Sequence, residues 1–216
     1  APGWRGNYMA APFHYAGNFI GAKEVALLCA LEIVYKNGIV DYVTDTLGED
    51  ALTSVQVWEC ERKGRDREDK PDYKVKLSVA FCFSNKINAL EYYHNSSFLE
   101  HGGSPDKAVV NAFTYSIDQY LKANGKYNKN EGKITFADVE DCLVLVSNSF
   151  STETSYENQT KKAISNKFIQ EAMTEFLRHE LEVYFIENKN QPIFLNIFLN
   201  IFSSFLLTYR KICVIL

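Results

Sequence analysis

The stretch YKVKLSVAFCF, residues Tyr73–Phe83, decides the fold class of this chain, because its side chains alternate between two faces along its whole length. The apolar and aromatic face consists of Tyr73, Val75, Leu77, Val79, Phe81 and Phe83. The other face begins with Lys74 and Lys76. Alternation with a period of two residues is typical of a β-strand that is buried on one side.

The residues before this strand predict its partner. Residues 52–60 are rich in Val, Thr and Trp and indicate a second strand. The loop between the two strands, residues 62–71, carries charges of both signs together with Gly64 and Pro71. We therefore predict a β-hairpin with a long, solvated tip.

The residues after the strand continue the pattern with two further strands and three helices. The strands are predicted over residues 87–93 and 142–148. The helices are predicted from residue 105 up to Gly125, with an apolar face over 109–121, and over 136–141 and 164–185. Two glycines, Gly102 and Gly103, precede the first of these helices, where Ser104 is a candidate N-cap. Thr135 is a candidate N-cap for the short helix. Upstream, residues 39–43 suit the first turn and a half of a helix.

The order of these elements predicts an α+β fold. Helices that follow a run of strands indicate a sandwich, with the helices on one face of a mostly antiparallel four-stranded sheet. The predicted domain covers residues 38–189. Residues 1–37 remain unassigned, because their glycines interrupt any regular period.

Composition restricts the possible functions. The chain is 46% hydrophobic and 14% aromatic, which indicates a globular protein. Its net charge of -4 gives no electrostatic reason to expect strong independent binding to DNA or to an anionic membrane, so a nucleic-acid role would need a partner or a local patch. The five cysteines are odd in number and form no CxxC pair, which favours the reducing cytoplasm. His94, Glu100 and His101 do not have the spacing of helical metal ligands, so we predict no metal site.

The apolar tail, residues 190–216, differs from the rest of the chain. Residues 192–207 are mostly Ile, Phe and Leu, but Asn196 and Asn200 interrupt the run. Two interpretations stand: a membrane span of marginal length, or an abnormal continuation of the reading frame.

The candidate functional site is the loop Gln159-Thr160-Lys161, between the last strand and the last helix. A loop on a rigid strand–helix support is a common place for a binding site. One amide and one ammonium presented together suit a phosphate group. From the residues alone, however, exposed Gln, Thr and Lys are more commonly just solvated.

Four motifs in order resemble one known family. They are GIVDYV at residues 38–43, EHGGS at 100–104, DVED at 138–141 leading to LVLVS at 143–147, and QTK at 159–161. The chain resembles the transducer domain of the B subunit of bacterial type IIA DNA topoisomerases, that is, DNA gyrase and topoisomerase IV. Ser104 and Pro105 replace the Thr-His that usually follows the double glycine, so the residues do not separate gyrase from topoisomerase IV.

This resemblance implies a fold and a site. The fold would be the ribosomal protein S5 domain 2-like sandwich. Lys161 would contact the γ-phosphate of ATP as the catalytic residue, and Gln159 would help to orient that phosphate. Glu157, Asn158 and Lys162 would only shape or solvate the loop.

The resemblance also implies cofactors and partners. Most ligands for ATP and Mg²⁺ would come from an N-terminal GHKL-type ATPase domain, since we find no adenine or Mg²⁺ motif in this chain. The partners would be the topoisomerase A subunit, a second B subunit in an ATP-dependent dimer, and double-stranded DNA. The alternative function is a non-enzymatic α+β interaction module that is attached to a membrane through the apolar tail.

Overall fold

The computed structural model describes residues 39–47, 50–84, 86–127 and 132–188. In chain order its elements are α2 (Ile39–Leu47), β1 (Gln56–Gly64), β2 (Tyr73–Phe83), β3 (Ala89–His94), β4 (Ser97–Phe98), α3 (Ser104–Ala123), α4 (Phe136–Glu140), β5 (Leu143–Ser151) and α5 (Lys167–Glu187). The α+β class predicted from the sequence is confirmed.

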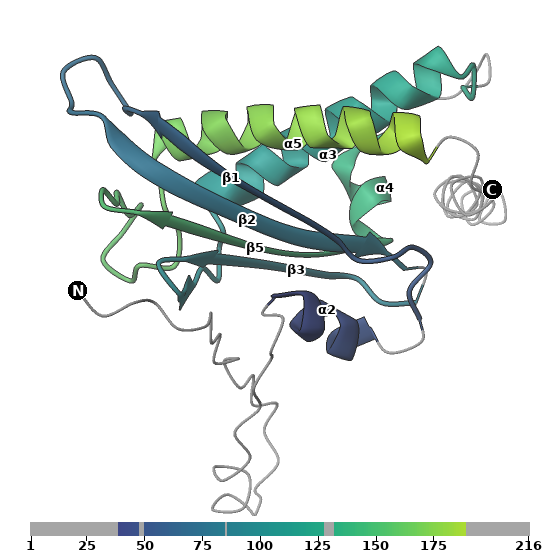
Figure 1. Cartoon of the computed structure of the whole chain (residues 1–216), viewed down its shortest axis with the longest axis horizontal. Helices are drawn as coiled ribbons and strands as arrows, with labels where there is room; N and C mark the ends of the chain where they lie inside the picture. Colours follow the sequence, from purple (N-terminus) through teal and green to yellow (C-terminus); the bar gives the residue numbers. More distant parts are fainter. Residues whose placement is uncertain (1–38, 48–49, 85, 128–131, 189–216) are drawn as a thin grey trace, which may run out of the picture.

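The strands form one sheet with the order β1-β2-β5-β3-β4 (Figure 1). Strand β2 pairs antiparallel with β1 and with β5, and β3 pairs antiparallel with β4. Among the strand pairs of the described residues, only β3–β5 is parallel. Parallel neighbours need a long crossover, and here that connection contains α3 and α4.

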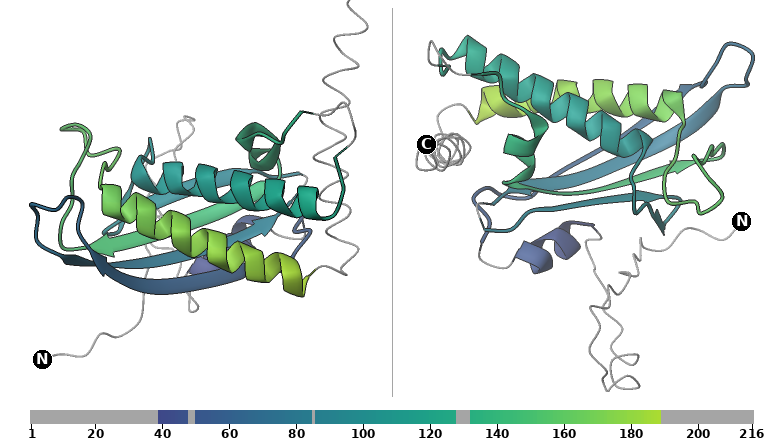
Figure 2. Two further views of the ribbon diagram at one scale, coloured as in Figure 1. Left: turned by 90° about the horizontal axis from the view of Figure 1, so that it is seen from above. Right: turned by 180° about the vertical axis from the view of Figure 1, so that it is seen from behind.

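Helices α3 and α5 lie side by side over one face of the sheet (Figure 2). The predicted apolar face of β2 is buried beneath them. Phe81 lies near the centre of this core, where its ring meets Trp58 at 4.7 Å and Phe113 at 5.3 Å, both edge to face. Edge-to-face aromatic pairs contribute about 0.5–1.5 kcal/mol each beyond their burial. The alternation in the sequence therefore identifies the main core correctly.

The predicted sheet needs two corrections, to its number of strands and to the placement of the helices. It has five strands, because the two-residue strand β4 adds an edge next to β3. Helix α2 lies on the face opposite α3 and α5 (Figure 1). There Ile39 and Val43 pack with Ala80, Cys82, Val144 and Val146. The part of this face that α2 covers is apolar, and burial raises the pKa of the Cys82 thiol to about 12.

Two predicted boundaries also move. Strand β1 begins at Gln56 and continues to Gly64, so its charged end lies on the edge of the sheet, where charges are common. Helix α5 begins at Lys167 rather than at residue 164, because Ile164 pairs as an isolated bridge with Gly103 and with Tyr156.

The ends of the chain lie outside the described residues, so neither the unassigned segment 1–37 nor the apolar tail 190–216 has a structural account. Within the described ranges, no helix combines the length and apolarity needed to cross a membrane.

Candidate functional site: an anchored loop between β5 and α5

The connection from β5 to α5 folds back on itself as a short two-stranded neck. Tyr156 and Ile164 form an antiparallel bridge. On either side of it, the amide of Glu157 donates to the carbonyl of Ala163 at 3.0 Å, and the amide of Ser165 donates to the carbonyl of Ser155 at 2.7 Å. We call residues 155–157 and 163–165 the neck, and residues 158–162 the tip.

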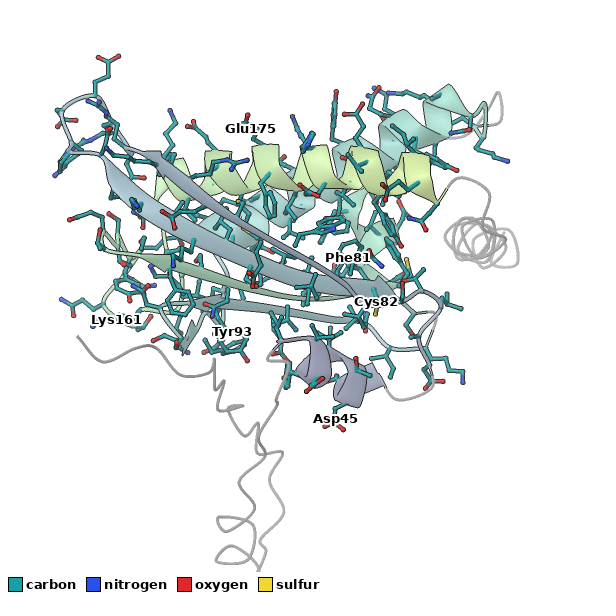
Figure 3. The ribbon with its side chains drawn as sticks, viewed as in Figure 1. Asp45, Phe81, Cys82, Tyr93, Lys161 and Glu175 are labelled. Atoms are coloured by element: carbon teal, nitrogen blue, oxygen red, sulfur yellow. The ribbon has the colours of Figure 1, made fainter. Side chains whose placement is uncertain are left out.

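The tip holds both predicted site residues, Gln159 and Lys161, and both are exposed. The Asn158 carbonyl accepts the Lys161 amide at 3.3 Å, which closes a turn. Lys161 adopts a left-handed backbone with a φ of 59°, a conformation that costs a non-glycine residue about 1–2 kcal/mol. Its ammonium lies 5.6 Å from the centre of the Tyr156 ring, and its side chain points away from the sheet (Figure 3).

The first anchor of the neck is the turn before α3. The amide of Ser104 donates to the carbonyl of Ile164 at 2.8 Å, and the Ser104 hydroxyl donates to the same oxygen at 3.1 Å. The amide of His101 donates to the carbonyl of Lys162 at 2.9 Å. The predicted capping role of Ser104 is therefore wrong, because its hydroxyl is used by the neck and Gly103 is the N-cap residue.

Gly103 allows this close approach. Its φ is 81°, and a Cβ atom at this position would lie 2.2 Å from the carbonyl oxygen of Ile164. No side chain fits there. The predicted glycine turn thus holds the neck against α3.

Two ion pairs join the same elements. Lys107 on α3 pairs with Glu157 at 3.2 Å, and Lys162 pairs with Glu100. All four side chains are substantially exposed, so each pair contributes only about 0–1 kcal/mol. Lys161 takes part in none of the ion pairs among the described residues, so the two adjacent lysines have different roles.

The second anchor is the tip of the β1–β2 hairpin. One carboxylate oxygen of Asp66 accepts the amide of Phe168 at 2.8 Å and the Tyr73 hydroxyl at 3.0 Å. The other oxygen accepts the side-chain amide of Asn166 at 2.9 Å. The prediction of a solvated tip is therefore wrong at this residue, since Asp66 satisfies the N-terminus of α5 as a capping side chain would.

The third anchor is His94, at the end of β3. Its imidazole is fully buried. The ring nitrogen Nδ1 lies 2.8 Å from the Ser149 hydroxyl, and Nε2 lies 2.8 Å from the Thr154 hydroxyl. Thr154 immediately precedes the neck. Burial lowers the pKa of His94 from 6.5 to about 4, because desolvation penalises the charged ring.

This shift predicts acid sensitivity. The folded state favours neutral His94. The contribution of His94 to the free energy of unfolding is therefore complete above pH 6.5 and is lost as the pH falls towards 4. We expect the free energy of unfolding to fall by about 1 kcal/mol per pH unit across this window from His94 alone. Urea unfolding between pH 7 and pH 4 measures it.

The matched variants are His94→Gln, which cannot titrate, and His179→Gln on the exposed side of α5. The first should flatten the pH dependence and the second should leave it unchanged. Identical slopes in wild type and His94→Gln would show that His94 does not carry the effect.

The structure thus brings Gln159 and Lys161 onto one tip that three separate elements support. Sequence reasoning missed Asp66, Asn166 and His94 as anchors. Asn166 stands directly before a helix, which is an N-cap signal. Asp66 has no local signal for this role, because the two partners that it anchors, Asn166 and Phe168, are about 100 residues away. In the described part of the chain, no group of three or more His, Cys, Asp or Glu side chains could hold a metal ion.

Comparison with solved structures supports this architecture. The 43K ATPase domain of Thermus thermophilus gyrase B, crystallised with an aminocoumarin, aligns with a TM-score of 0.64 and 19% identity, over 85% of this chain and 47% of that one. The topoisomerase IV ATP-binding domain of Francisella tularensis, in complex with a small-molecule inhibitor, aligns with a TM-score of 0.59 and 21% identity, over 78% of this chain and 42% of that one. At such identities the likeness shows a shared fold.

Sequence relatives are similar to the chain over most of its length. The DNA gyrase B protein of Metamycoplasma arthritidis is 24% identical over 173 residues, which cover 80% of this chain and 27% of that protein. The DNA topoisomerase 4 B protein of Rickettsia felis is 22% identical over 159 residues, 73% of this chain and 23% of that protein. The chain thus spans about a quarter of the length of the curated relatives it matches.

A family model described as DNA gyrase B matches residues 38–205. The match begins at the predicted start of the domain and continues past its predicted end at residue 189. It covers well over half of the sequence. The chain therefore belongs to the DNA gyrase B family.

Proposed function

We propose that this chain is the transducer domain of a type II DNA topoisomerase B subunit, with an S5 domain 2-like fold. In this proposal Lys161 senses the γ-phosphate of ATP bound by an adjoining GHKL-type ATPase domain. The observation that carries it is the exposed Lys161 at the end of a neck fixed by three separate elements. The relatives described as ATPase or ATP-binding domains support it further.

The strained backbone at Lys161 supports a functional role. A glycine would adopt the left-handed conformation at little cost, yet this position carries a lysine with a φ of 59°. Strain of this kind occurs often at functional sites. Lys161 also buries no side chain in the core, so packing does not explain the residue.

The chemistry of the tip suits a terminal phosphate. The Lys161 ammonium would neutralise negative charge on the transferred phosphoryl group, and the Gln159 side-chain amide would donate a hydrogen bond to a phosphate oxygen. The neck would hold both groups in place, which matters because phosphoryl transfer depends on positioning. The neck is hydrogen-bonded to α3, and the residues next to it, Thr154 and Asn166, are hydrogen-bonded to β3 and to the hairpin tip. A displacement of Lys161 would therefore be coupled to movement of the whole domain.

Adenine and Mg²⁺ would be bound mainly by residues of the ATPase domain. The tip offers two phosphate contacts, while the nearby carboxylates of Glu157 and Glu100 are engaged by Lys107 and Lys162.

The complete protein would couple ATP hydrolysis to a change in DNA topology. It would act with a topoisomerase A subunit and a second copy of itself, on double-stranded DNA. A rigid domain between the nucleotide and the rest of the protein can pass on the nucleotide state by rigid-body movement.

This proposal predicts that residues 1–216 alone do not bind ATP with micromolar affinity, because two phosphate contacts without base or metal ligands are too few. Calorimetry with Mg²⁺ and ATP tests the isolated chain. The complete B subunit, in which this chain is joined to its ATPase domain, should bind and hydrolyse ATP in the same buffer.

Two outcomes would contradict the proposal. Micromolar binding to the isolated chain would place a whole nucleotide site within it. A complete B subunit without ATP turnover would instead favour a non-enzymatic interaction module.

A further inference from the structure

Asp66, in the tip of the β1–β2 hairpin, connects a distant part of the chain to the neck. The hairpin tip, the N-terminus of α5 and the β5–α5 connection lie at the same end of the molecule (Figures 1 and 2). Asp66 bonds to Asn166, and the Asn166 side-chain oxygen accepts the amide of Ser155 at 2.8 Å. Asp66 therefore contacts the residue that holds the first strand of the neck.

The hairpin tip is built to hold Asp66 in this position. Arg65 pairs with Asp72 across the tip at 2.7 Å, and the amide of Lys70 donates to the carbonyl of Arg67 at 3.1 Å. Gly64 lies against the Phe168 ring, where a Cβ atom would be 2.3 Å from a ring carbon. The hairpin thus rests directly on the first turn of α5.

The side chains that Asp66 contacts are buried. Asn166 is 1% exposed and Tyr73 is 5% exposed. The Tyr73 ring meets the Phe168 ring edge to face at 5.3 Å. The side-chain NH₂ of Asn166 also lies 3.2 Å from the Tyr73 hydroxyl and 3.4 Å from the Glu153 carbonyl. Loss of the Asp66 carboxylate would therefore remove its shortest, charge-assisted hydrogen bond and leave it with these two longer bonds to neutral acceptors.

We propose that Asp66 and Asn166 are positioning residues for Lys161, so that the β1–β2 hairpin sets the geometry of the phosphate-sensing tip. This inference rests on the proposed function of Lys161. Neither residue reaches the phosphate itself, since Asn166 is buried and Asp66 is occupied by α5. Their effect passes through Ser155 and the neck to the tip.

A double-mutant cycle in the complete B subunit tests the proposal. Asp66→Ala, Lys161→Ala and the double variant are compared with wild type for steady-state ATP turnover. Small misplacements of a positioned group cost up to about 10²-fold, so we expect Asp66→Ala to lower kcat by roughly tenfold. KM for ATP should stay within about twofold of the wild-type value, because the contacts that bind ATP equally in the ground state and the transition state would lie in the ATPase domain.

The interaction between the two substitutions separates positioning from general damage. If Asp66 acts through Lys161, then Asp66→Ala should cause no further loss in a protein that already carries Lys161→Ala. The control is Asp69→Ala in the same hairpin tip. Among the described residues Asp69 pairs with the exposed Arg67, so this variant should behave as wild type.

A milder variant covers the case in which Asp66→Ala fails to fold. Asp66→Asn retains an oxygen acceptor for the Phe168 amide but places an NH₂ group against Asn166. Asp66→Asn should lower kcat less than Asp66→Ala does. It too should cause no further loss when it is combined with Lys161→Ala. Melting curves are recorded for every variant.

The outcomes distinguish the two claims. Wild-type turnover in Asp66→Asn and Asp66→Ala overturns the positioning role and leaves the proposed function intact. The positioning role is also overturned, with the proposed function intact, if the Asp66 substitution lowers turnover equally in the wild-type and Lys161→Ala backgrounds. Wild-type turnover in Lys161→Ala overturns the proposed function, and the positioning role falls with it.

Discussion

Lys161→Ala in the complete B subunit is expected to lower ATP turnover by about 10²-fold, the usual effect of removing one preorganised charge-stabilising donor. The side chain is exposed, so its removal leaves no cavity and stability should change little. Lys161→Gly should be equally inactive but slightly more stable, because glycine relieves the left-handed backbone at this position. Steady-state ATPase rates, with melting curves beside them, measure both effects.

The adjacent lysine is the control. Lys162 forms an exposed ion pair with Glu100, so Lys162→Ala should cost no more than about 1 kcal/mol of stability and retain most of the turnover. If both alanine variants lost only a little ATP turnover, and by the same amount, the tip would be an ordinary polar surface and not a phosphate site.

Gly103→Ala is expected to destabilise the domain by about 3 kcal/mol or more. Gly103 has a φ of 81° and a ψ of -124°, a sparsely populated backbone conformation that costs a residue with a side chain about 1–3 kcal/mol. The new Cβ atom would in addition lie 2.2 Å from the Ile164 carbonyl oxygen, so the neck must move away from α3. Two hydrogen bonds from Ser104 to that carbonyl would be lost with it.

Gly125→Ala separates the two causes. Gly125 is left-handed, with a φ of 59°, but a Cβ atom added there would meet nothing within 4 Å among the described residues. This variant should therefore show only the backbone cost of about 1–2 kcal/mol. Chemical denaturation of both variants gives the difference, and equal losses would mean that the Gly103 contact does not hold the neck.

Local sequence patterns are enough to predict the main layers of the fold. The alternation of Tyr73–Phe83 identifies the face that α3 and α5 cover. The predicted N-cap of the short helix, Thr135, is confirmed, and its amide donates to Asp138 at 2.8 Å. Both signals lie within a few residues of the structure they determine.

The remaining features depend on contacts between distant residues. The placement of α2 on the second face follows from an apolar patch that Ala80, Cys82 and Val146 form only once β2 and β5 are paired. In the sequence, Asp66 is one of several charged residues in a charged loop. Its role as the hydrogen-bond acceptor at the N-terminus of α5 depends on the folded hairpin lying against that helix. No periodicity in a single sequence predicts such a contact.

The residues alone predict only part of the candidate site. Gln159 and Lys161 stand out because they lie between a strand and a helix, outside both apolar patterns. The neck has no comparable signal, because residues 163–165 match the helical period in the sequence but pair instead with residues 155–157. The roles of Gln159 and Lys161 at a phosphate stay predictions.

Amine labelling of the complete B subunit would show directly whether Lys161 contacts the γ-phosphate of ATP. Lys161 is acetylated under limiting reagent and quantified by mass spectrometry, with exposed Lys107 as the internal reference. A non-hydrolysable ATP analogue should protect Lys161 strongly, whereas ADP, which lacks the γ-phosphate, should not. Equal labelling of Lys161 with the analogue and with ADP would contradict the assignment of this lysine to the γ-phosphate.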